Sequence, residues 1–139
     1  MPNSKELIVH LEDEPGTLEN CCRVLSNLAI NILAFQGYGC EGQSVIRMVV
    51  DRLVEAKQAF AAANIHCTEN EVLETALPHY PGELSRAASL LGKAGVNISY
   101  AYCGTDSRSG MPVVIFGVSD IAKAAPLLDE IANEGTRAA

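Results

Sequence analysis

An internal repeat constrains this chain of 139 residues more than any other feature of its sequence. The stretch 15–32 reappears at 81–98, an offset of 66 residues. These eighteen positions contain six identities without a gap, whereas average composition gives about one. Such a repeat restricts the fold to architectures that are built twice from one unit, so the sequence predicts two halves, residues 1–70 and 71–139. The identities pair Pro15 with Pro81, Gly16 with Gly82, Leu18 with Leu84, Leu25 with Leu91, Asn31 with Asn97, and Ile32 with Ile98.

Hydrophobic spacing in the first half predicts the order strand, helix, strand, strand, helix, strand. Alternating apolar residues indicate a strand, and apolar residues three and four apart indicate one face of a helix. Pro15 favours a helix start, because its missing amide hydrogen is harmless in the first helical turn. The expected elements are a strand over 7–11, a helix from Leu18, strands over 31–38 and 44–50, a helix over 53–63 and a short strand over 65–68.

The second half repeats most of this order. It predicts strands over 72–77, 97–103 and 112–118, with helices over 84–94 and 121–131. Pro126 is expected to kink or restart the last helix, because proline removes a backbone hydrogen bond. The residues after Asn133 are too few and too small for a clear closing strand.

Two such units predict an α+β protein made of two ferredoxin-like modules. In each module, two helices cover one face of an open antiparallel sheet, and the second copy lacks a clear final strand. The segments VIRMVV and VVIFGV are apolar at nearly every position, which predicts burial of both strand faces. The strand over 72–77 would also have an open edge. Both features predict a homodimer.

Composition excludes several classes of function. The formal charge of −7 argues against binding to nucleic acids or anionic membranes, which depends on basic patches. No apolar run reaches the length of a membrane span, and MPNSKE is not a signal peptide, so a cytoplasmic protein is expected.

The sequence contains no pattern typical of catalysis or metal binding. The five cysteines include no Cys-x-x-Cys pair and predict free, unreactive thiols. His66 and its neighbour Cys67 lack the closely spaced further ligands that a metal site needs. We therefore expect no catalytic residues, no metal and no cofactor.

A strand ending in EDEPGTL, followed by a helix and AINI, resembles the ACT domain, a small regulatory module of amino-acid metabolism. The second copy shows PHYPGEL and AGVNISYAY. The resemblance covers nearly the whole chain and implies a free-standing tandem ACT protein without a catalytic domain. It implies binding of a small effector, usually an amino acid, between a strand-to-helix turn and the second strand of a neighbouring module. A partner enzyme of amino-acid metabolism would be a further consequence.

The resemblance also implies which residues contact the effector. Free amides at Gly16, Thr17 and Leu18 would receive its carboxylate, and Gly16 would let it approach the backbone. Serine-sensing members of the family use a polar residue two positions before the proline and the Asn that opens the second strand. Asp13 and Asn31 hold these positions in the first copy, which is favoured because His79 is bulkier than the usual residue. The implied ligand-binding residues are Asp13, Glu14, Gly16, Thr17, Leu18, Asn31 and Ile32, and His79, Gly82, Glu83, Leu84, Asn97 and Ile98.

Simpler interpretations remain open for the same residues. The acids before Pro15 also favour a helix N-terminus without any ligand. Asn31 and Asn97 could only satisfy backbone groups at a turn. His10 and His66 are predicted to be packing or surface residues. The alternative function is a purely structural subunit of an enzyme of amino-acid metabolism, with vestigial ligand sites.

Overall fold

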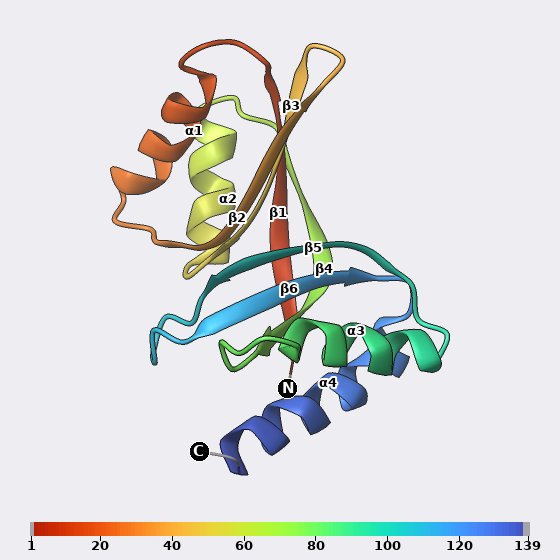
Figure 1. The fold of residues 1–139 in the computed structure, drawn as a ribbon. Coiled ribbons are helices and arrows are strands. Elements are labelled where there is room, and N and C mark those ends of the chain that lie inside the picture. The colour runs from red at the N-terminus through yellow and green to blue at the C-terminus, as the bar shows by residue number, and fades with distance from the viewer. Residues whose placement is uncertain (1, 138–139) are drawn as a thin grey trace. The chain divides into compact units, whose positions relative to one another are not determined.

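The computed structural model describes residues 2–137 and contains six strands and four helices in that range (Figure 1). Residues 138 and 139, at the end of the expected second half, lie outside the described residues. The helices and most strands lie where the hydrophobic spacing predicts them. The elements are β1 (Asn3–Glu12), α1 (Thr17–Ser26), β2 (Ile32–Cys40), β3 (Gln43–Val50), α2 (Leu53–Ala62), β4 (Cys67–Ala76), α3 (Glu83–Lys93), β5 (Ile98–Thr105), β6 (Pro112–Val118) and α4 (Ile121–Arg137).

The chain forms two compact units. The first unit is Glu6–Asn70, and the second consists of residues 71–137 together with residues 2–5. In the first unit, β3 pairs antiparallel with β1 and with β2, and Leu7 and Phe35 both lie opposite Met48. Helices α1 and α2 cover one face of this sheet (Figure 1). Its core contains Leu7, Val9, Cys21, Leu25, Ile30, Ile46, Met48, Val50, Ala56 and Phe60.

The second unit repeats this arrangement with β4, β6 and β5. Leu73 lies opposite Phe116, and Tyr102 lies opposite Ile115. Helix α4 continues through Pro126, so the helix does not restart there. The core contains Leu73, Leu77, Ala87, Leu91, Val96, Val114, Phe116, Ala124, Leu128 and Ile131.

Strands β1 and β4 each continue from one unit into the other. The sequence predicts two strands, over 65–68 and 72–77. The structure has a single strand there, β4, because the polar residues between the two predicted strands are also extended. Its residues up to Asn70 belong to the first unit and the rest to the second. The strand order β1-β3-β2-β5-β6-β4 closes as a six-stranded barrel. The prediction of two separate ferredoxin-like modules with open sheets is therefore wrong.

Pro2 and Ser4, which belong to the second unit, contact its strand β4 at Glu74. The amide of Glu74 donates to the carbonyl of Pro2 over 2.7 Å. Burial raises the pKa of the Glu74 carboxyl group, and a hydrogen bond with Ser4 opposes this rise. The edge that was expected to be open over 72–77 is thus occupied by residues of the same chain.

Both faces of β3 and β6 are buried within a single chain, as their apolar sequences predict. Met48 and Val49 lie on opposite faces of β3, and Ile115 and Phe116 lie on opposite faces of β6. All four side chains are at most 4% exposed. Neither this burial nor the edge of β4 therefore requires a second copy of the chain.

A partly buried ion pair distinguishes the first unit. The carboxylate of Glu6 has no exposed surface and accepts hydrogen bonds from Nη1 of Arg47 at 2.8 Å and Nδ2 of Asn70 at 3.2 Å. Buried carboxylates are rare unless they are paired in this way.

Candidate functional site

The two Pro-Gly turns have the same backbone geometry. Gly16 precedes α1 with φ +90° and ψ −13°, and Gly82 precedes α3 with φ +91° and ψ −12°. Residues with a Cβ rarely adopt this left-handed conformation, so the turn itself requires glycine. A Cβ at either position would meet no other atom within 4 Å, which leaves the space beside each turn open.

Hydrogen bonds within the turns repeat as well. Thr17 donates its amide to the carbonyl of Glu14 at 3.3 Å, and Glu83 donates to Tyr80 at 3.4 Å. The amide of Thr17, which was expected to be free, is therefore used within the turn. After each of these two turns, the next two helix amides have no acceptor among the described residues, and they belong to Leu18 and Glu19 in α1 and to Leu84 and Ser85 in α3. Each helix thus begins with two adjacent unpaired donors, beside the exposed side chains of Leu18 and Leu84.

Asp13 lies against the hairpin that joins β2 and β3. Its amide donates to the carbonyl of Gly42 at 3.0 Å, and its carboxylate accepts a hydrogen bond from the hydroxyl of Ser44 at 3.2 Å. A Cβ at Gly39 would lie 2.6 Å from Oδ2 of Asp13, so this glycine makes room for the carboxylate. His79 is exposed, and so is Tyr80.

Asn31 and Asn97 occupy equivalent places just before β2 and β5. The amide of Asn31 donates to the carboxylate of Asp51 at 3.0 Å, and that of Asn97 donates to the hydroxyl of Ser119 at 2.9 Å. Each Asn carbonyl accepts the amide of the same partner. The following residues, Ile32 and Ile98, pack against the helix-side cores.

The first unit separates Asp13 from Asn31. Asp13 lies beside Gly39, near the end of β2, whereas Asn31 precedes the start of that strand. Eight residues of extended chain span about 26 Å, far more than the length of an amino acid. The turn residues are thus brought together, but no single effector in one unit can contact both Asp13 and Asn31.

A groove of about 600 Å³ begins at the first turn and follows α1. We call it the first-unit groove. Leu11, Val24 and Ile65 are its apolar residues besides Ala63, and all three are partly buried against the core. Its lining consists of His10, Leu11, Glu12, Glu14, Thr17, Asn20, Arg23, Val24, Asn27, Ala63, Asn64, Ile65 and His66.

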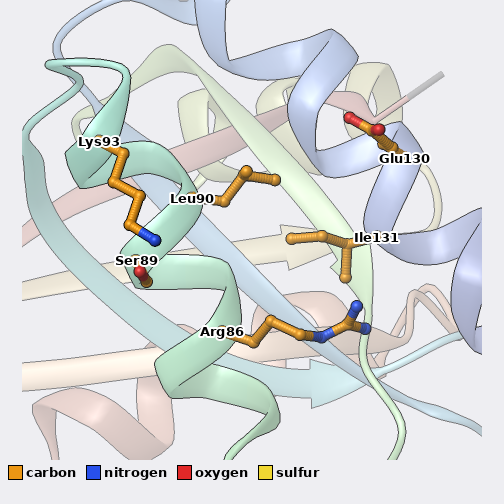
Figure 2. A pocket seen from close by; sticks show the side chains of 6 residues that line it. All are labelled: Arg86, Ser89, Leu90, Lys93, Glu130 and Ile131. Carbon is orange, nitrogen blue, oxygen red and sulfur yellow. The ribbon is translucent and has the colours of Figure 1, made fainter.

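The second unit contains a related but smaller groove of about 310 Å³ between α3 and α4, the second-unit groove. Its α3 residues are the equivalents, 66 positions on, of Asn20, Arg23, Val24 and Asn27. Leu90 and Ile131 point toward one another across it (Figure 2). The lining consists of Arg86, Ser89, Leu90, Lys93, Glu130 and Ile131.

Sequence reasoning identified Glu14 and Thr17 but missed the rest of the first-unit groove. His10 and His66 were expected to be packing or surface residues, and both line the groove. The repeat contained a signal that could have pointed to the groove. Two α1 positions that line the groove carry neutral amides in the first copy and basic residues in the second. Asn20 corresponds to Arg86, and Asn27 corresponds to Lys93.

Other chemistry is scarce in the described part of the chain. All five cysteines are free. Burial raises the pKa of Cys21 to about 12, with smaller contributions from the nearby thiols of Cys22 and Cys67. Within residues 2–137, no cluster of three His, Cys, Asp or Glu side chains is arranged to hold a metal ion. None of the helices described there is long and apolar enough to cross a membrane.

No family model matches the sequence, and neither does any curated protein. Solved structures do match. A protein from Bacteroides thetaiotaomicron is similar with a TM-score of 0.82 and 24% identity, over 93% of this chain and 88% of that one. The ligand-free regulatory subunit of aspartate kinase from Thermus thermophilus is similar with a TM-score of 0.65 and 14% identity, over 96% and 92% of the two chains.

A third structure, the regulatory subunit of aspartate kinase from Thermus flavus, has a TM-score of 0.53 and 14% identity. It is covered over 97% of its length, and this chain over 95%. These likenesses establish the fold. This chain shares that fold with all three solved structures.

Proposed function

We propose that this chain is a non-catalytic regulatory protein that binds an amino acid at its strand-to-helix turns. The observation that carries the proposal is the repeated turn, in which an open left-handed glycine precedes two adjacent unpaired helix amides. Two donors at the positive end of a helix suit a carboxylate. The duplication of this arrangement favours binding over catalysis, which would need an asymmetric set of reacting groups.

The first turn is the better candidate for the α-amino and α-carboxylate groups together. Glu14 lies in this turn and lines the first-unit groove, so its carboxylate is available for an ammonium group. Asp13, at the same turn, is already held by Ser44. The second turn has His79 and Tyr80 at the corresponding positions and offers no carboxylate before its proline.

Proteins of similar fold support a regulatory role. Two of the similar structures are regulatory subunits of aspartate kinase, and this chain covers more than nine tenths of each. By analogy, the effector would alter the affinity of this chain for a partner enzyme of amino-acid metabolism. Regulation of this kind requires the effector to bind two states with different affinities.

We further propose that the halves, residues 1–70 and 71–139, are tandem ACT-type copies and that the protein is a homodimer. Since the sheet faces and the edge of β4 are covered within one chain, support for the dimer comes from exposed apolar side chains of the first unit. These are Phe35 and Tyr38 on β2 and Leu28 after α1. Sedimentation equilibrium at micromolar concentration tests this, and a 14.8 kDa species would contradict it.

A thermal-shift screen of the full chain with each of the twenty amino acids tests the function. A ligand at 100 times its dissociation constant adds about 2.7 kcal/mol to the free energy of unfolding. In a domain of this size that shift is several degrees. Isothermal titration would then give the affinity and stoichiometry. A flat screen would contradict the proposal and favour the structural subunit with vestigial sites.

A further inference from the structure

The first-unit groove begins directly at the first Pro-Gly turn. Glu14 and Thr17 belong both to the turn and to the groove lining. The hydroxyl of Thr17 donates back to the carbonyls of Glu12 at 2.8 Å and Glu14 at 3.0 Å. Its side chain is therefore held against the turn, and the groove is open at this end.

In the second unit, an ion pair occupies the corresponding place. Glu83 and Arg86, the equivalents of Thr17 and Asn20, form a salt bridge of 3.0 Å along α3. The second-unit groove begins only at Arg86, and neither Tyr80 nor Glu83 lines it. The second turn is thus separated from its groove by a charged pair, whereas the first turn is continuous with its own.

The lining of the first-unit groove contains acidic and apolar residues together with the polar residues Asn20, Arg23 and Asn27. The carboxylates of Glu12 and Glu14 lie at the turn end, which suits an ammonium group. Leu11, Val24 and Ile65 also line the groove with partly exposed apolar surface, and His66 lines it as well. A volume of about 600 Å³ is ample for the largest amino-acid side chains.

We propose that the first-unit groove receives the side chain of the effector and thereby selects an amino acid with a large apolar side chain. This inference rests on the proposed function, because the turn must first hold the amino and carboxylate groups. Each buried methylene contributes about fourfold in affinity. Leucine has three more carbons than alanine and should therefore bind roughly 50-fold more tightly.

The test is isothermal titration of the full chain with leucine, phenylalanine, alanine and aspartate. The wild-type protein should prefer leucine and phenylalanine over alanine and aspartate. Val24→Lys places a charge among the apolar groove residues and should weaken leucine binding at least tenfold, while alanine, whose side chain is too short to reach it, binds as before. The matched control is Leu90→Lys at the equivalent position of the second-unit groove, which should change neither affinity.

A second variant avoids the partly buried Val24. Thr17→Glu combined with Asn20→Arg rebuilds the ion pair of the second unit on α1, at positions that are not part of the core. It should close the groove and remove the preference for leucine over alanine. Circular dichroism would show that each variant is folded.

The outcomes separate the two proposals. The groove assignment would be overturned if the wild-type protein preferred small or charged amino acids. It would also be overturned if Val24→Lys lowered the affinities for alanine and leucine equally. Either result would leave the proposal of an amino-acid sensor intact. If no amino acid binds to the wild-type protein, both proposals fail together.

Discussion

The two units use the same strand positions with opposite chemistry. In the first unit, Glu6 and Arg47 directly precede the paired residues Leu7 and Met48 and form a partly buried ion pair. In the second unit, the corresponding residues before Leu73 and Phe116 are Val72 and Ile115, and neither has exposed surface. One strand geometry therefore accepts either a charged pair or an apolar pair, provided that both members are of the same kind.

Breaking the ion pair should have the largest effect. Glu6→Val alone removes the carboxylate that pairs with Arg47 and should lower the free energy of unfolding by about 3 kcal/mol, the lower end of the cost for buried pairs, because the Arg47 side chain is 18% exposed. Combining it with Arg47→Ile copies the second unit and should recover most of that loss, because paired apolar residues often replace buried ion pairs without cost. Urea unfolding of both variants measures this. If the double variant is no more stable than Glu6→Val alone, other residues must decide why one unit holds an ion pair and the other an apolar pair.

The two glycines test whether equal turns have equal functions. Gly16→Val and Gly82→Val both force a side chain into a left-handed conformation and should each destabilise the fold by about 1–2 kcal/mol. Gly16→Val should also reduce amino-acid affinity by about 100-fold, or roughly 2.7 kcal/mol, because the new side chain occupies the approach to the helix amides. Titration calorimetry distinguishes the two variants. Equal losses of affinity would show that both turns bind.

Asp13 and Asn31 test whether one unit contains the whole site. Glu14→Ala should weaken binding by about 1–3 kcal/mol, because its carboxylate is the proposed ammonium acceptor, and Asp13→Ala should weaken it less, because Ser44 already holds that carboxylate. Asn31→Ala should have no effect, since the first unit places it about 26 Å away along β2. A loss with Asn31→Ala would instead indicate that the effector contacts this residue in a second copy of the chain. Asn97→Ala is the matched control.

The ion pair at the start of α3 tests the difference between the grooves. Glu83→Thr combined with Arg86→Asn copies the open groove entrance of the first unit. It should add weak binding at the second turn and raise the stoichiometry measured by calorimetry from one toward two. A stoichiometry that stays at one would show that the carboxylates of the first turn, absent from the second, are also required.

Cys21 offers the smallest expected effect. Its equivalent in the second unit is Ala87, which is also fully buried, so Cys21→Ala should cost only about 1 kcal/mol at neutral pH. Because burial raises the pKa of this thiol from 9.0 to about 12, the unfolded chain loses the proton first, and the stability of the wild-type protein falls from about pH 9 upward. Urea unfolding at pH 8 and pH 10 should show a smaller fall for Cys21→Ala than for the wild type.

Local patterns predicted the helices and strands well, because hydrophobic spacing and the Pro-Gly turns act over a few residues. The resemblance to the ACT domain rested on the same repeated turn. The closed strand order could not be predicted in this way. The polar residues around Asn70 look like a connection, and nothing local shows that Pro2 pairs with Glu74.

The candidate site was predictable only at the turns. The repeat identified Gly16 and Gly82 because a left-handed turn leaves a clear sequence signature. The groove lining could not be found by motif, because His10 and His66 lie far apart in the sequence and line one groove only after α1 and α2 have packed. The distance between Asp13 and Asn31 depends on the sheet register. That register cannot be predicted from the identity of either residue.

The hydrogen bond between Glu74 and Pro2 has a consequence for synthesis on the ribosome. Pro2 is synthesised before the first unit, but its partner Glu74 follows only after the whole first unit has been translated. Closing so large a loop carries an entropic cost, which is smaller once the intervening segment has folded and its ends have been brought together. The first unit should therefore fold before the second, and pulse-labelled hydrogen exchange should protect the amide of Met48 before that of Phe116. A shortened chain that begins at Glu6 should fold its first unit normally and leave the second incomplete.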